Sequence, residues 1–212
     1  MYISRVQIDI DNRRKIKELT HVGAFHHWVE ECFPEEIANH IRSRKLWRVD
    51  QLQGKSYLLV VSSGLPDVKA LEKYGVEGSA QIKVYDQFLN SLEESHRMRF
   101  RVVLNPVIAL SQGSGHKSLV KPHVTAEYQG KYLLDRSEKN GFSLKKDEFS
   151  IVERGYVFFR KSGGRPLRFI KVVYEGVLTI SDINLFRKML IAGLGKHKAY
   201  GFGMMTVIPL SY

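Results

Sequence analysis

Apolar residues along the first half of the chain follow two patterns, strict alternation and helical spacing. Residues 2–10 alternate, with Val6 and Ile8 on one face, and predict a strand. Residues 23–33 place apolar side chains at every third or fourth position and predict a helix, which Pro34 ends or converts into a new turn. The same patterns predict strands at 46–49, 56–62 and 81–88, and a short helix from Pro66 to about Tyr74.

The second half repeats this order with longer insertions. Helices are expected at 124–138 and after a cap at Ser181 or Asp182. Residues 111–121 are polar, glycine-containing and basic, and predict a mobile loop; Gly163-Gly164 is a hairpin-turn signal. Strands are expected at 97–104, 151–160, 167–178 and 204–208.

Each half therefore has the order β-α-β-β-α-β, which is typical of the ferredoxin-like fold. We predict an α+β protein with two tandem ferredoxin-like (RRM-like) domains. The first is expected at 1–92 and the second at 97–212, with the join near residues 91–96.

The chain of 212 residues has a formal net charge of +11. A protein this basic usually meets a polyanion, most often nucleic acid, with an acidic membrane surface as the competing partner. No apolar stretch approaches the roughly 20 residues that span a bilayer. The N-terminus alternates and has no apolar block like that of a signal peptide, so we expect a cytoplasmic protein. The single cysteine, Cys32, excludes an internal disulfide and a multi-cysteine zinc site, and its apolar helix face predicts burial.

A glycine-rich segment at 193–203 combines backbone freedom with positive charge. Its glycines permit close approach of a ligand, and its backbone N–H groups and lysines can hold phosphate oxygens. The segment follows a helix and leads into a strand, so it is neither a Walker A loop nor a dinucleotide fingerprint. A helix cap followed by a tight turn is the structural alternative. The candidate phosphate-binding residues are Gly193, Gly195, Lys196, Lys198, Gly201 and Gly203.

The adjacent pair His26-His27 lies on the first predicted helix. No cysteine or histidine spacing suits a metal, and no carboxylate pair suits catalysis, so no cofactor is expected. Helical spacing puts His26 at the edge of the apolar stripe and His27 nearer the polar face. From position alone, two surface histidines are the simpler interpretation. A histidine base without a metal suits a reaction whose nucleophile is supplied by the substrate, such as the 2′-OH of RNA.

Basic and aromatic residues are interleaved in the predicted hairpin at 154–168. Alternation predicts that its aromatic residues face the core and its cations face outward, where they can follow an RNA backbone or enter a stem groove. An ordinary edge hairpin with protective charges is the alternative. A second basic segment carries Lys117 and Lys121. The hairpin candidates for RNA binding are Arg160, Lys161, Arg165 and Arg168.

Several motifs together resemble the CasE subfamily of CRISPR-associated repeat-processing endoribonucleases, which belongs to the RAMP superfamily. The resemblance covers nearly the whole chain, and its most specific part is an apolar helix, the 193–203 loop and an apolar strand. The other matching segments are 1–6, His26-His27-Trp28-Val29, 100–106, Lys121-Pro122-His123-Val124 and 174–178 with Asp182.

The resemblance implies metal-independent cleavage at the 3′ base of a CRISPR repeat hairpin in precursor crRNA. The 2′-OH attacks, and the products carry a 5′-hydroxyl and a 2′,3′-cyclic phosphate or a 3′-phosphate. The family's helix-1 histidine falls on His26, with His27 as the fallback. Some members have a tyrosine one turn earlier, where this chain has Gly23. The general acid therefore stays unassigned, with His27, a lysine or water as the candidates. The cleaved crRNA and other Cascade subunits are the implied partners.

Two other functions remain compatible with the sequence. One is a RAMP-type RNA-binding subunit that does not cleave. The other is a basic ferredoxin-like module that binds nucleic acid generally. Binding that depends on a specific hairpin distinguishes the RNA-binding subunit from the general nucleic-acid-binding module. Cleavage of the RNA strand distinguishes the nuclease from both.

Overall fold

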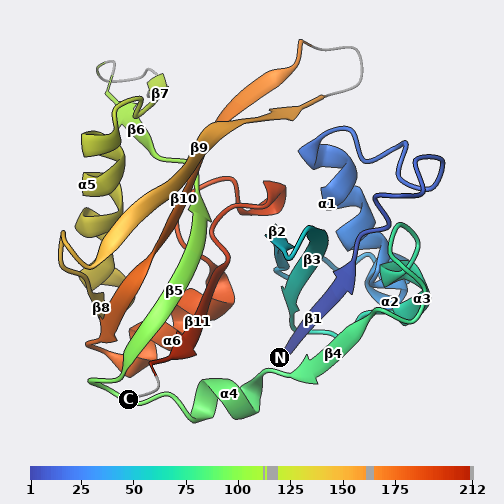
Figure 1. The fold of residues 1–212 in the computed structure, drawn as a ribbon, viewed down its shortest axis with the longest axis horizontal. Coiled ribbons are helices and arrows are strands. Elements are labelled where there is room, and N and C mark those ends of the chain that lie inside the picture. Colours follow the sequence, from blue (N-terminus) through green and yellow to red (C-terminus); the bar gives the residue numbers. More distant parts are fainter. Residues whose placement is uncertain (112, 114–118, 161–164, 211–212) are drawn as a thin grey trace.

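The computed structural model describes residues 1–111, 113, 119–160 and 165–210, which form two antiparallel sheets and a separate two-stranded hairpin (Figure 1). The expected turn at Gly163-Gly164, and Lys117 and Lys161, lie outside these residues. None of the helices within the described ranges is long and apolar enough to cross a membrane.

The first sheet has the strand order β2-β3-β1-β4, with every neighbouring pair antiparallel. This is the ferredoxin-like order that the sequence predicts. Val6, Leu58 and Val60 face α1 and α3 and form one buried cluster with Trp28 and other residues of those helices. The elements of this half are β1 (Tyr2–Gln7), α1 (Val22–Glu31), α2 (Pro34–Ala38), β2 (Leu46–Leu52), β3 (Lys55–Ser62), α3 (Val68–Leu71), β4 (Gln81–Val84) and α4 (Asp86–Asn90).

The second sheet repeats this order, because β5 and β10 are central, β9 pairs with β10, and β11 pairs with β5. A short strand, β8, pairs with the far end of β10. The elements are β5 (Arg97–Leu104), β6 (Val107–Leu110), β7 (Leu119–Pro122), α5 (Ala126–Ser137), a 3₁₀ turn η1 (Glu138–Asn140), β8 (Phe142–Ser143), β9 (Phe149–Phe159), β10 (Leu167–Ile180), α6 (Ile183–Ala192), a 3₁₀ turn η2 (Lys198–Tyr200) and β11 (Met205–Pro209). The predicted fold class is confirmed.

The segment expected to be a strand at 81–88 is in fact a shorter strand and a helix. β4 ends at Val84, and α4 begins at Asp86. Tyr85 and Leu89 are both buried, and the ring of Phe88 stacks on that of Tyr85 with centroids 5.7 Å apart. Spacings of three and four residues place these side chains on one side of a helix, and this burial outweighs a continued strand.

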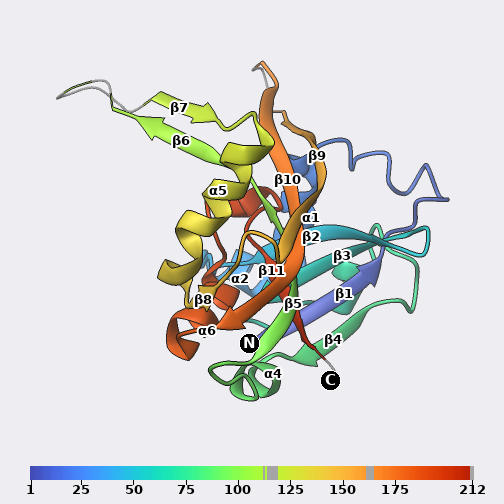
Figure 2. The ribbon, with the colours of Figure 1, turned by 60° about the vertical axis from the view of Figure 1, so that its left-hand side comes forward.

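The prediction of a loop through Lys121 is wrong for residues 119–121. Leu119 to Pro122 form β7, which pairs with β6 in register from Leu110–Leu119 to Val107–Pro122. Apolar residues on β6 and β7 supply cross-strand contacts that a polar composition does not reveal. The resulting hairpin extends from the edge of the molecule beside α5 (Figure 2).

The hairpin of β9 and β10 also differs from its prediction. Tyr156 and Phe158 are about half exposed, whereas Val157 packs against a buried cluster with Phe169 beside it. Residues 156–159 are apolar on both faces, so alternation could not identify the buried face. Arg168 lies opposite Phe158, and its guanidinium stacks over the Tyr156 ring at 4.2 Å. The outward face therefore carries aromatic and basic side chains together.

A buried arginine joins the two sheets. Arg48 on β2 is 2% exposed, and its guanidinium forms two bonds of 2.6 and 2.7 Å with the Asp50 carboxylate. It also donates to the carbonyl oxygens of Arg101 and Met204 and to the hydroxyl of Thr206, at 2.8 to 3.0 Å. All five guanidinium donors are thereby used. Because the last three acceptors belong to the second half, Arg48 fixes the orientation of one sheet relative to the other.

Replacing Arg48 should destabilise the protein strongly. Arg48→Ala leaves buried acceptors without a donor and should lower the free energy of unfolding by about 3–5 kcal/mol. Arg97→Ala is the matched control, because its ion pair with Glu148 is partly open to solvent and should contribute less than about 1 kcal/mol. Urea denaturation measures both variants, and equal losses would contradict the assigned role.

Candidate active site

His26 lies at the boundary between the core and solvent, as its place in the helical pattern indicates. Its side chain is 32% exposed, and the ring packs edge-on against Tyr200, with centroids 5.8 Å apart and planes at 79°. The Nδ1 atom faces the Glu30 carboxylate at 3.8 Å, which is too long for a hydrogen bond but close enough for attraction to a protonated ring. Nε2 is therefore the nitrogen left to meet a substrate.

The surroundings of His26 favour its neutral form. Burial lowers the pKa of His26 below its ordinary value, and Glu30 opposes this shift. Arg42 and Lys45 lower the pKa of His26 further through their positive charge. Lys45 is itself buried and contacts Glu30 at 3.3 Å, so it shares the carboxylate that faces the imidazole. At neutral pH His26 is consequently able to accept a proton.

His27 lies on the outer side of α1. Its side chain is 73% exposed, and Nε2 lies 3.3 Å from the carboxylate of Glu31, one turn along the helix. The ring has no packing partner comparable to Tyr200 among the described residues. The structure thus separates the two histidines, with His26 held in place and His27 in solvent.

Three segments that are distant in sequence meet at the beginning of α1. The Tyr200 ring of η2 packs against both His26 and Phe159, the latter at 4.7 Å between centroids. Phe159, the last residue of β9, packs edge-on against His21. A side chain at position 23 would collide with the Phe159 ring, because a Cβ there would lie only 2.9 Å from it. The helix, the basic hairpin and the glycine-rich loop therefore share one edge of the molecule (Figure 1).

Much of the glycine-rich loop bonds to the protein itself. The backbone N–H groups of Gly193, Leu194 and Gly203 donate to the carbonyl oxygens of Met189, Gly203 and Val103. Gly201 has a φ of +81°, and a Cβ there would lie 2.8 Å from the Trp47 ring. The indole N–H of Trp47 donates to the carbonyl oxygen of Ala199 at 3.0 Å. These contacts dock the loop on β2 and set the position of Tyr200.

The two lysines of the loop have different environments. Lys196 is exposed. The Lys198 ammonium donates to the Ala192 carbonyl oxygen at 2.8 Å, near the C-terminus of α6, where a positive charge is favourable. Burial lowers the pKa of Lys198, and the nearby Arg44 lowers it further. The remaining loop glycine, Gly195, has a φ of +80° and faces the Tyr132 hydroxyl.

The basic residues of the hairpin lie on its exposed surface. Arg160 and Arg165 flank the undescribed residues 161–164, and Arg168 covers Tyr156. Lys121 is exposed on β7. In Figure 1 the β6–β7 and β9–β10 hairpins lie at the end of the molecule where α1 begins. Arg160 follows Phe159, which contacts Tyr200, and Arg42 and Lys45 are close enough to lower the pKa of His26, so positive charge gathers around this side chain.

Sequence reasoning missed four residues of this edge: His21, Arg42, Arg44 and Tyr200. The run of basic residues at 40–45, between a helix and a strand, could have indicated Arg42 and Arg44. Nothing in the local pattern could have placed Tyr200 beside His26, because a separation of 174 residues in sequence carries no periodic signal.

Comparisons with known proteins agree with this architecture. The model of a family described as CRISPR associated protein matches residues 1–209. The chain belongs to this family. It is 26% identical to the CRISPR-associated endoribonuclease Cse3 of Thermus thermophilus over 220 residues, which cover 99% of this chain and 100% of the relative.

Two solved structures show the same fold as this CRISPR-associated protein. One is Thermus thermophilus Cse3 bound to an RNA that represents a pre-cleavage complex, with a TM-score of 0.79, 23% identity and coverage of 98% of each chain. The other is a chain of a CRISPR RNA-guided surveillance complex, with a TM-score of 0.67, 19% identity and coverage of 99% of this chain and 100% of that one.

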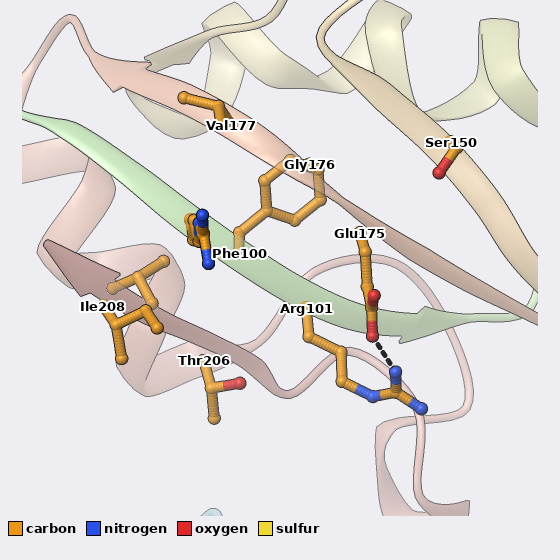
Figure 3. A pocket seen from close by; sticks show the side chains of 10 residues that line it. Phe100, Arg101, Ser150, Glu175, Gly176, Val177, Thr206 and Ile208 are labelled. Carbon is orange, nitrogen blue, oxygen red and sulfur yellow. Dashed lines mark hydrogen bonds and ion pairs between the residues drawn. The ribbon is translucent and has the colours of Figure 1, made fainter. Parts of the chain in front are cut away.

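A groove of about 480 Å³ lies elsewhere on the second sheet of this CRISPR-associated protein (Figure 3). Its lining residues come from β5, β9, β10 and β11, and include Arg99, Arg101 and Glu175. Arg101 and Glu175 form an ion pair across its floor. No histidine is among the described residues that line it, so the groove is separate from the site around His26.

The protonation of His26 is directly measurable. The NMR titration of its ring protons should have a midpoint below 6.5, since burial disfavours the imidazolium. Glu30→Gln removes the only group identified as raising the His26 pKa within the described residues, so it should lower the midpoint further. Glu35→Gln, on α2, is the control and should leave it unchanged. A midpoint above 6.5, or an upward shift in Glu30→Gln, would overturn this account of the site.

Proposed function

We propose that this protein is a metal-independent endoribonuclease that cleaves CRISPR repeat hairpins in precursor crRNA. The observation that carries the proposal is His26, a half-buried imidazole with a lowered pKa at an edge rich in basic side chains. Family membership over residues 1–209 and the full-length likeness to an endoribonuclease support it.

The chemistry follows from the position of His26. Its Nε2 accepts the proton of the 2′-OH, and the 2′-oxygen attacks the neighbouring phosphorus. The bond from phosphorus to the 5′-oxygen then breaks, and this oxygen takes a proton from solvent. The products carry a 2′,3′-cyclic phosphate and a 5′-hydroxyl. Because the protein supplies the base and the RNA supplies its own nucleophile, the proposed reaction requires no metal ion.

The basic residues around His26 hold the RNA in this proposal. Arg160, Arg165 and Arg168 contact the hairpin stem, and the exposed aromatic rings beside them add apolar contact. Lys121 and Lys196 hold backbone phosphates. The half-buried Lys198 acts mainly by positioning the loop, because its ammonium already bonds to α6. The cleaved crRNA stays bound, and the protein joins other Cascade subunits, as the likeness to a chain of a surveillance complex supports.

His26→Ala should slow cleavage by about 10²- to 10⁴-fold and leave RNA binding nearly intact, because it removes a proton acceptor and no phosphate contact. The substrate is an end-labelled repeat hairpin from the CRISPR array of the source organism, incubated in EDTA. A single 2′-deoxy substitution at the scissile nucleotide should abolish cleavage by removing the nucleophile. Single-turnover rates and filter binding measure the two effects separately.

His27→Ala, which alters the exposed neighbour, is the matched control and should cleave at close to the rate of the unaltered protein. Loss of activity in His27→Ala alone would move the general base to that residue. Tight hairpin binding without any cut by the unaltered protein would instead identify a non-cleaving RNA-binding subunit. Equal binding of unrelated RNAs would indicate a general nucleic-acid module.

A further inference from the structure

A second imidazole lies at the beginning of α1. His21 is the N-cap residue of this helix, and its Nδ1 accepts a hydrogen bond from the backbone N–H of Gly23 at 3.0 Å. The ring folds back over position 23, so that a Cβ there would lie 2.8 Å from Cε1 and 2.9 Å from Nδ1 of His21. Only a glycine leaves this space free. The conformation of His21 therefore depends on Gly23.

The cap bond fixes which ring nitrogen carries the proton. A backbone N–H is always a donor, so Nδ1 must be unprotonated while it accepts this bond. The proton of the neutral ring is therefore on Nε2, on the other side of the imidazole. No hydrogen-bond partner of His21 Nε2 is found among the described residues. His21 thus presents an N–H donor away from the helix end.

The His21 ring fills the side-chain space of position 23, which lies about one helical turn before His26. Positions 23 and 26 are three residues apart, and Cβ atoms at this spacing on a helix lie about 5–6 Å apart. The ring therefore takes the place of a side chain that would neighbour His26. Two aromatic rings link the imidazoles through a chain of contacts. Phe159 packs edge-on against His21, Tyr200 packs edge-on against His26, and the Phe159 and Tyr200 rings pack against each other. A phosphate whose 2′-OH neighbour reaches His26 therefore lies within range of His21 Nε2–H.

We propose that His21 is a second catalytic residue, which donates a hydrogen bond from Nε2 to a non-bridging oxygen of the scissile phosphate. This inference rests on the proposed function. Negative charge grows on that oxygen as the 2′-oxygen attacks, and a fixed donor stabilises it more in the transition state than in the ground state. His21 transfers no proton in this role. His26 remains the base, and solvent protonates the 5′-oxygen.

A purely structural cap is the competing role, and the choice of residue argues against it. Serine, threonine, aspartate and asparagine are the preferred N-caps, and histidine offers no advantage as an acceptor. His21→Ser should therefore keep the helix capped while it removes the Nε2 donor. This substitution separates catalysis from stability in one variant.

The test measures single-turnover cleavage of the repeat hairpin by His21→Ser. We expect a loss of about 10- to 100-fold in rate, with the denaturation midpoint and the hairpin affinity unchanged. Gly23→Ala should give a similar loss in the unaltered background, because its Cβ displaces the His21 ring, and a much smaller additional loss when combined with His21→Ser. His96→Asn is the control, since His96 is exposed and lies outside the site.

A sulfur substitution identifies the atom that His21 contacts. Each phosphorothioate diastereomer at the scissile position replaces one non-bridging oxygen with a poor acceptor. One diastereomer should slow the unaltered protein more than the other, and His21→Ser should reduce this difference, which loss of a structural cap would not do. Cleavage by His21→Ser at the unaltered rate would overturn the role of His21 alone. No cleavage by the unaltered protein would overturn both this role and the proposed function.

Discussion

The arrangement of this protein depends on one buried guanidinium. A single ferredoxin-like sheet can fold on its own elements, but nothing in its hydrogen-bond pattern dictates how two such sheets face each other. Arg48 supplies that constraint, because its planar set of donors finds five acceptors only when β2, β5, and β11 with the residue before it lie in one orientation. Charge burial is tolerated here because Asp50 and the backbone carbonyls replace water completely.

The geometry of the candidate site depends on this contact between the two sheets. Trp47, the neighbour of Arg48 on β2, holds the carbonyl of Ala199 and packs under Gly201, so the loop that presents Tyr200 is anchored next to the arginine. Tyr200 then supports His26 and Phe159 at once. A side chain in the second half thereby sets the surroundings of an imidazole in the first half. The environment of the proposed catalytic histidine is therefore formed by residues of both halves.

The sequence predicted elements well where one face is buried and poorly where both faces are apolar. The ferredoxin-like order of strands and the boundary position of His26 followed from periodicity. The cap was expected at Ser181 or Asp182, and the structure has Asp182. Residues 156–159 and 119–122 did not, because burial there depends on which neighbour covers the strand. The basic character of the site edge could be anticipated from composition. Its aromatic packing and the fold of His21 over Gly23 could not, since both arise from segments brought together only by the sheet junction.

The acceptors of Arg48 also set an order in folding. The first sheet contains its own strands and can form before the second sheet. Met204 and Thr206, however, follow Arg48 by 156 and 158 residues, and Tyr200 precedes them by only a few positions. A chain in which only the first sheet has formed therefore carries His26 without the ring that supports it. Docking of the second sheet on the first and assembly of the surroundings of His26 are thus a single step.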